Sequence, residues 1–146
     1  MYNYSLYDEK TFYDRFVADL LKYKEEVIIE SPFITTARMH MFYSVFEELM
    51  RKCVKVVVVT RDPREHTNPY KEQSEAVIQW FERIGIQPLL CVGNHHRKLA
   101  IVDRKILWEG SLNILSQMKS REIMRRIDDK QLTEEMFRFL KLGKVL

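Results

Sequence analysis

The run Val54-Lys55-Val56-Val57-Val58-Val59 constrains the fold of this chain more than any other segment. Five of its six residues are valine, whose branched side chain favours strands, and apolar residues fill successive positions. A strand of this kind is covered on both faces of its sheet. The run therefore predicts a buried central strand.

Short apolar runs predict five further strands, and apolar residues at helical spacing predict four helices. The predicted strands lie at residues 27–29, 89–92, 99–102, 106–108 and 123–127. The predicted helices lie at residues 12–21, 37–52, 76–84 and 132–140. Residues 61–69, which include two prolines, predict a loop. The pattern indicates one α/β domain over residues 1–146, with a mixed sheet flanked by helices.

Composition excludes several classes of protein. Hydrophobic residues make up 46% of the chain, which favours a packed core over disorder. No apolar run approaches the roughly 20 residues of a membrane-spanning helix, and residues 1–5 do not resemble a signal peptide. Cys53 and Cys91 are too few for a disulfide framework. We therefore expect a cytoplasmic protein with no membrane partner.

Positive charge is concentrated in one part of the chain. The net charge is only +3, but residues 91–126 hold eight Lys or Arg against three acids. A basic segment within a nearly neutral chain indicates a local anionic partner such as phosphate.

A polar pattern within that segment predicts a phosphate site. If residues 96–103 were one strand, His96 and Lys98 would point the same way and Asp103 would project from the other face. His96 would then be a nucleophile or proton carrier beside a fixed cation. Further along the chain, Gly110 permits close approach of the backbone to a ligand, and a serine and an asparagine that follow it offer neutral hydrogen bonds.

These residues resemble a known signature. The pattern His96-x-Lys98-x4-Asp103-x6-Gly110-Ser111-x-Asn113 is similar to the HKD motif of the phospholipase D superfamily. Residues 120–126 and 30–34 also resemble phospholipase-D-like nuclease domains, including those attached to some helicases. The resemblance implies a sheet with helices on both faces and phosphodiesterase chemistry.

The resemblance also implies how the reaction proceeds. His96 would attack phosphorus and form a covalent phosphohistidine, while Lys98 and Asn113 would hold the non-bridging oxygens. A histidine attacks only when neutral, and Lys98 beside it opposes protonation of the ring. Because preplaced donors meet the developing charge, neither a metal nor a cofactor is required.

The remaining roles come from the same resemblance. Ser111 would support the loop before Asn113, Glu122 would orient the nucleophilic histidine, and Asp103 would be structural. Further contacts with substrate are expected from Gly110, Arg121, Ser31 and Phe33.

The family uses two such motifs in each active site, and this chain has one. His40, His66 and His95 each lack a lysine two residues further on. We therefore expect a homodimer in which His96 meets its symmetry mate.

Other readings of the polar residues are weaker. Cys53, Cys91, His95 and His96 lack the closely spaced pairs of a zinc site. Asp103-Arg104-Lys105 matches part of a metal-dependent nuclease pattern, but no partner acid precedes it. His66 and Arg61 fall in the predicted loop and could contact substrate, but solvated side chains are the rule in loops.

A metal-independent nuclease is the leading prediction, with DNA expected rather than RNA. Arg121, Arg125 and Arg126 would bind backbone phosphates. The first alternative is a catalytically silent nucleic-acid-binding module that serves a helicase or restriction partner. The second is a phospholipid phosphodiesterase, which the lack of an interfacial amphipathic helix disfavours.

Overall fold

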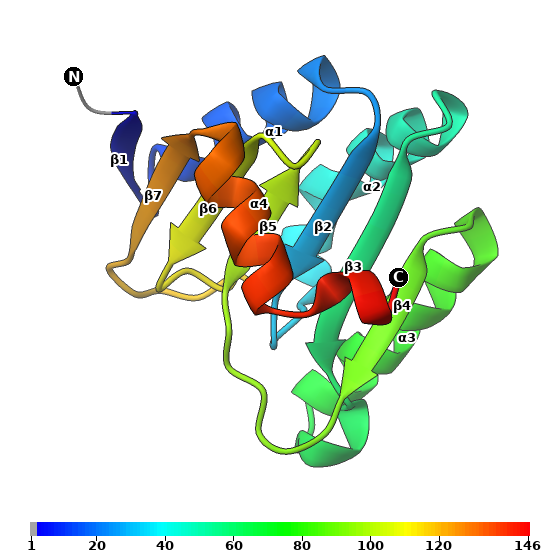
Figure 1. Cartoon of the computed structure of the whole chain (residues 1–146). Helices are drawn as coiled ribbons and strands as arrows, with labels where there is room; N and C mark the ends of the chain where they lie inside the picture. The colour runs from blue at the N-terminus through cyan, green and yellow to red at the C-terminus, as the bar shows by residue number, and fades with distance from the viewer. Residues whose placement is uncertain (1–2) are drawn as a thin grey trace.

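The computed structural model describes residues 3–146, and seven strands form one mixed sheet in it (Figure 1). The strands are β1 (Tyr4–Asp8), β2 (Glu26–Glu30), β3 (Lys55–Arg61), β4 (Gln87–Cys91), β5 (Leu99–Val102), β6 (Ile106–Gly110) and β7 (Ile123–Asp128). Their order across the sheet is β1-β7-β6-β5-β2-β3-β4. Strands β2, β3 and β4 run parallel, and every other neighbouring pair is antiparallel.

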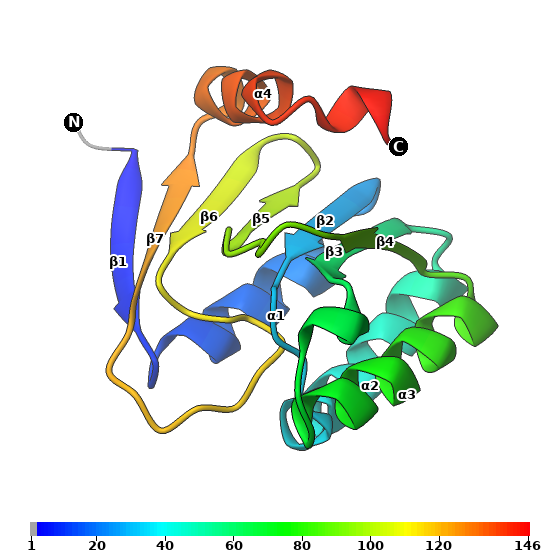
Figure 2. The same cartoon turned by 90° about the horizontal axis from the view of Figure 1, so that it is seen from below.

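Helices cover both faces of the sheet, which confirms the predicted α/β architecture. Three helices lie against one face, namely α1 (Phe12–Lys22), α2 (Thr36–Arg51) and α3 (Tyr70–Ile84) (Figure 2). The other face carries α4 (Lys130–Phe139) and the short 3₁₀ helix η2 (Leu142–Lys144) (Figure 2). A second 3₁₀ helix, η1 (Pro63–Glu65), follows β3. Among residues 3–146, no helix is both long and apolar enough to cross a bilayer.

Strand β3 is buried on both faces, as its valines predict. Val56 and Val58 belong to the larger core beneath α1, α2 and α3, whereas Val57 and Val59 pack on the side of α4. Successive side chains of a strand point to opposite faces, so only an apolar residue at every position satisfies both cores.

The sheet topology brings distant segments to one edge. Strands β2 and β3 run parallel, so their last residues, Glu30 and Arg61, lie at the same end. Strand β5 is antiparallel to β2 with Glu30 opposite Leu99, so the segment that enters β5 reaches that same end. The end of β6 follows, because Leu99 pairs with Glu109. This edge therefore collects residues that are far apart in the sequence.

Strand β1 was not predicted from the sequence. It is an edge strand that pairs only with β7, and most of its side chains are exposed, Leu6 to 69%. Tyr7 packs against the core, but the other side chains of the strand are exposed, so it shows little hydrophobic pattern, which is the reason it was missed. Strand β4 begins two residues earlier than predicted and contains Pro88, which an edge strand tolerates.

Candidate active site

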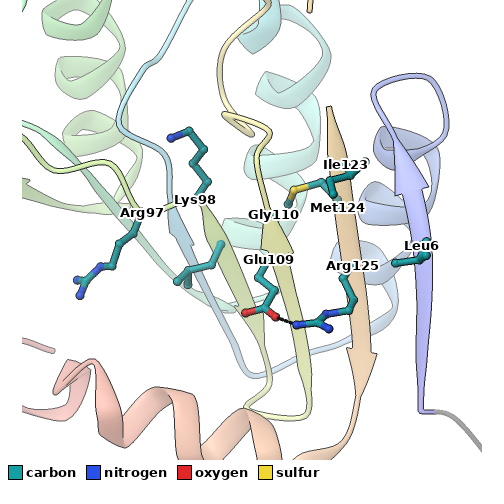
Figure 3. A pocket seen from close by; sticks show the side chains of 9 residues that line it. Leu6, Arg97, Lys98, Glu109, Gly110, Ile123, Met124 and Arg125 are labelled. Carbon is teal, nitrogen blue, oxygen red and sulfur yellow. Dashed lines mark hydrogen bonds and ion pairs between the residues drawn. The ribbon is translucent and has the colours of Figure 1, made fainter. Parts of the chain in front are cut away.

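Residues 95–98 lie just before β5, and a buried carboxylate holds this segment in place. Glu30 is 0% exposed, and its Oε1 lies 3.0 Å from Nε2 of His95 and 3.0 Å from Nε of Arg97. His95 and Arg97 thus turn toward Glu30, and Lys98 points away from Arg97 (Figure 3). The sequence did not assign Glu30 a role, because the two contacts span more than sixty residues.

His96 is exposed on this segment and meets two cations. Nη2 of Arg61 lies 2.9 Å from Nε2 and 3.3 Å from Nδ1 of the His96 ring. Nζ of Lys98 donates to the backbone carbonyl of His96 at 2.8 Å. The Lys98 ammonium group therefore lies on the backbone of His96, while the imidazole itself contacts a guanidinium group that the sequence did not predict.

These surroundings lower the pKa of His96 and so favour its neutral form. Loss of water around the ring lowers its pKa, and the positive charges of Arg61, Lys98 and His95 lower it further. Burial also lowers the pKa of Lys98, and Arg61 adds to that effect while Glu122 opposes it. A neutral imidazole holds the lone pair that a nucleophile needs.

Asn113 and Glu122 line a small hollow together with Tyr13 and Arg38. Oδ1 of Asn113 is buried without a hydrogen-bond partner among the described residues, and Oε1 of Glu122 accepts a bond from Ser120 Oγ at 2.7 Å. Burial raises the pKa of Tyr13 to about 12, and its hydroxyl donates to the carbonyl of Ile114.

No hydrogen bond or ion pair joins Glu122 to His96 within residues 3–146, where the ring nitrogens contact Arg61 instead. The structure therefore does not bring Glu122 onto the ring of its own chain, and the role in orienting the nucleophile stays a prediction.

Gly110 and Ser111 join the ends of β6 and β7. A Cβ atom at Gly110 would lie 2.2 Å from the carbonyl oxygen of Ile123, which explains why a glycine stands there. The Ser111 amide donates to that oxygen at 2.9 Å, and its hydroxyl accepts the Ile123 amide at 3.0 Å. Both residues thus support the loop that carries Asn113.

Asp103 is placed by a turn and not by strand alternation, so that part of the sequence argument is wrong. Strand β5 comprises only Leu99–Val102; His96 and Lys98 precede it, and Asp103 follows it with φ of 51°. Its carboxylate accepts the backbone N–H groups of three residues at the start of β2. They are Lys24, Glu25 and Glu26, at 3.1, 2.9 and 2.8 Å.

The side chains predicted to contact substrate differ in their burial and in their neighbours. Ser31 is fully buried, and its hydroxyl donates to the carbonyl of Phe33 and accepts the amide of Leu115, so it is a structural residue and not a substrate contact. The ring of Phe33 lies 4.8 Å from that of His66 and beside Arg61. Arg121 is exposed.

Two of the arginines that were predicted to bind phosphate form ion pairs within the chain instead. Arg126 is buried and forms a two-point ion pair with Asp19, which also accepts the indole N–H of Trp108. Arg125 is paired with Glu109 (Figure 3). Their partners belong to other elements, so nearness to the motif in sequence did not reveal them.

Arg61 and His66 are buried, each 7% exposed, although the sequence placed both in a solvated loop. Arg61 is the last residue of β3, and Nε2 of His66 donates to the carbonyl of Pro32. Within residues 3–146, no three His, Cys, Asp or Glu side chains are grouped as metal ligands. Cys53 and Cys91 are free thiols.

Solved structures share this fold. Nuc of Salmonella typhimurium, a phospholipase D family member, superposes with a TM-score of 0.72 at 19% identity, over 94% of this chain and 92% of Nuc. NucT of Helicobacter pylori gives 0.69 at 18% identity, over 94% and 92%. The archaeal chromatin protein TrmBL2, whose structure shows a novel mode of DNA binding, gives 0.64 at 10% identity, over 97% of this chain and 51% of TrmBL2.

A family model identifies the chain. None of the curated proteins matches it. The model described as "Cardiolipin synthase, PLD-like domain" matches residues 17–141, which include every residue of the HKD-like pattern. Membership supports phosphodiester chemistry at the level of the family. The chain belongs to the PLD-like domain family of the phospholipase D superfamily.

Proposed function

We propose that this protein is a metal-independent phosphodiesterase that cleaves nucleic acid through a phosphohistidine intermediate. DNA is the preferred substrate in this proposal. The observation that carries the proposal is the exposed His96 ring at one edge of the sheet, in contact with Arg61 and next to Lys98, whose charges help to lower the pKa of the ring. A neutral nucleophile flanked by cations suits an anionic phosphodiester, because the same cations that lower the pKa of the ring attract the substrate.

The proposed reaction has two steps. A ring nitrogen of the neutral His96 bonds to phosphorus while the bond from phosphorus to the leaving oxygen breaks, and that oxygen takes a proton from the partner's His96, which enters this step as the imidazolium and becomes neutral. Water then gives a proton back to the partner's His96 and attacks phosphorus, which breaks the phosphorus–nitrogen bond and restores the first ring. Lys98 and Asn113 are proposed to hold the non-bridging oxygens in both steps.

The second histidine in this scheme requires a second copy of the chain. An apolar surface beside Lys98 supports such a dimer: a hollow of about 510 Å³ is lined by Lys98, Gly110, and the side chains of Leu6 and Ile123 (Figure 3). Leu6 and Ile123 are 69% and 70% exposed. A two-fold contact over this surface would cover them and bring a second motif to the site.

Nucleic acid is proposed as substrate on the basis of charge. The segment around the motif is basic, and Arg121 is exposed near Glu122. Because backbone phosphates bind Lys and Arg by releasing counterions, the affinity for DNA is expected to fall steeply with salt. TrmBL2 shares the fold, and its structure shows a novel mode of DNA binding, which supports the choice of DNA and also the alternative of a binding module.

The deciding experiment compares wild type with His96→Ala on labelled DNA, labelled RNA and a chromogenic diester, all in EDTA. We expect the wild type to cleave and His96→Ala to lose cleavage by at least about a thousandfold, while binding of DNA persists. His40→Ala is the control, because His40 is exposed on α2.

Three outcomes would contradict the proposal in different ways. Wild type that binds DNA without cleaving it would favour the binding module. Cleavage that EDTA abolishes would favour a metal mechanism. An acid-labile phosphoryl group on His96, trapped by rapid quenching and located by mass spectrometry, is expected; its absence in an active enzyme would exclude the covalent step.

A further inference from the structure

Arg61 ends β3 as a buried cation without a carboxylate partner. None of the ion pairs found among residues 3–146 includes it, although the residue is only 7% exposed. Glu65 lies within its field, but the oxygens of Glu65 accept the amides of Gly93 and Asn94. Because buried charges in proteins are paired, the Arg61 guanidinium is suited to an anion that comes from outside the chain.

Neutral groups hold this guanidinium beside the nucleophile. Nε and Nη2 of Arg61 donate to the backbone carbonyl of His95 at 3.3 and 3.2 Å. The ring of Phe33 lies 5.0 Å from Cζ, within the range of a cation–π contact. Nη2 also contacts the His96 ring at 2.9 Å. These groups aim the guanidinium without neutralising its charge.

The contact with His96 has a chemical consequence. Nη2 of Arg61 lies at similar distances from both ring nitrogens, 2.9 Å from Nε2 and 3.3 Å from Nδ1, so it sits over the face of the ring and not on the axis of either lone pair. A phosphate oxygen accepts a guanidinium hydrogen bond more strongly than a neutral ring does. A phosphate that reaches His96 would therefore take this donor from the ring.

The geometry points to Arg61 as a substrate-binding residue, whose Nη2 hydrogen bond passes from the His96 ring to a non-bridging oxygen of the scissile phosphate. The inference rests on the proposed function, because that function makes the anion a phosphodiester. Arg61 then covers one face of the His96 ring in the free protein, and it shares the bound phosphate with Lys98. From the sequence, contact of Arg61 with substrate was the weaker of two interpretations.

The test uses inorganic phosphate and the full chain in EDTA, so it does not depend on cleavage. Binding is followed by NMR through the ring signals of His96 and the Nε–H signal of Arg61. We expect saturable shifts of both signals in the wild type. Arg61→Gln is expected to bind phosphate about tenfold to a hundredfold more weakly, as loss of a charge-assisted hydrogen bond requires, and Arg61→Lys to bind with intermediate affinity.

Arg64→Gln is the matched control. It removes the same charge three residues further along the chain, in η1, but Arg64 is paired with Asp62 and exposed. We expect its phosphate affinity to equal that of the wild type. Circular dichroism checks that each variant is folded, and the Arg61 signal of the wild type keeps the test valid if Arg61→Gln unfolds.

Two results would overturn the inference: equal phosphate affinity in Arg61→Gln and wild type, or phosphate binding to the wild type without a shift of the Arg61 signal. A different result would show that the proposed function is wrong while this inference holds. The wild type would then cleave no diester, yet it would still bind phosphate, and that binding would still depend on Arg61.

Discussion

Gly110 lies beside the candidate site, where the backbones of β6 and β7 approach each other closely. A Cβ atom there would lie 2.2 Å from the carbonyl oxygen of Ile123, an atom fixed by the β6–β7 pairing. We expect Gly110→Ala to lower the free energy of unfolding by about 1–3 kcal/mol, the usual range for overpacking. Urea unfolding measures this change.

Gly143→Ala provides the control for that experiment. A Cβ atom at Gly143 meets only the ring of Phe137, at 3.5 Å, which is an ordinary contact. Its free energy of unfolding should stay within about 0.5 kcal/mol of the wild type, as for surface substitutions. Equal losses at the two glycines would refute the explanation of Gly110.

His66 is the residue from which we expect a pH dependence of stability. Burial lowers its pKa in the folded protein, with Arg61 as a further cause and the Pro32 carbonyl opposing. Between this lowered pKa and the ordinary value near 6.5, the unfolded chain binds more protons, so stability is lost as pH falls through that window.

His66→Gln is therefore expected to reduce the loss of unfolding free energy between pH 7 and pH 5, as measured by urea unfolding at both values. The glutamine amide can still donate to the Pro32 carbonyl, so the comparison isolates the titration of the ring. His40→Gln serves as control. An unchanged difference between the two pH values in His66→Gln would contradict the assignment.

At the scale of elements, Asp103 ties the turn after β5 to the beginning of β2. Three backbone N–H groups donate to its carboxylate, and its φ is positive. Asp103→Ala is expected to cost about 1–3 kcal/mol of unfolding free energy, because charge-assisted hydrogen bonds are lost and alanine is strained at positive φ. Asp103→Asn should cost less, because asparagine tolerates that backbone and keeps one acceptor.

Both Asp103 variants should retain wild-type cleavage for each folded molecule, since the carboxylate is engaged by backbone. The measurement is the cleavage rate divided by the folded fraction at the same temperature. A loss of more than tenfold in the folded Asp103→Asn protein would mean that the carboxylate takes part in catalysis.

Helix α4 shows which part of an element a sequence pattern leaves open. Its apolar residues predicted a helix, which is confirmed, but not every apolar residue faces the core. Thr133 and Phe137 are buried, whereas Phe139 is 79% exposed. The hydroxyl of Thr133 donates to the carbonyl of Asp129 at 2.7 Å. A polar residue that satisfies its hydrogen bond within the helix can be buried, and hydrophobic spacing does not register this.

At the scale of the whole molecule, the proposed dimer gives the largest expected effect of a surface substitution. Ile123→Asp places a charge on the apolar surface beside Lys98, and burial of that charge in a two-fold contact would be strongly unfavourable. We expect a dimer in the wild type and a monomer in Ile123→Asp by light scattering, with at least about a hundredfold less cleavage because the second histidine is missing.

Phe139→Asp is the matched control, because Phe139 is similarly exposed but lies on α4, away from the motif. It should remain dimeric and active. A wild type that cleaves as a strict monomer, or an Ile123→Asp variant that cleaves normally as a monomer, would exclude the paired-histidine mechanism.

The class of fold and the motif could be predicted from the amino-acid sequence alone. Hydrophobic periodicity depends on neighbours within a few residues, so it predicted the four helices and six of the seven strands. The spacing from His96 to Asn113 is equally local, and the family match includes it. Strand β1, in which Tyr7 packs against the core and the other side chains are exposed, shows no such pattern.

Only the tertiary structure decided which charged residues surround the motif. Arg61 contacts His96, which lies 35 residues further along the chain. Glu30 binds Arg97, 67 residues further along. Asp19 pairs with the buried Arg126, 107 residues further along. Each of these contacts depends on the order and direction of the strands. Local spacing carries no information on that order, because it is the closure of long loops around a shared core that brings such residues together.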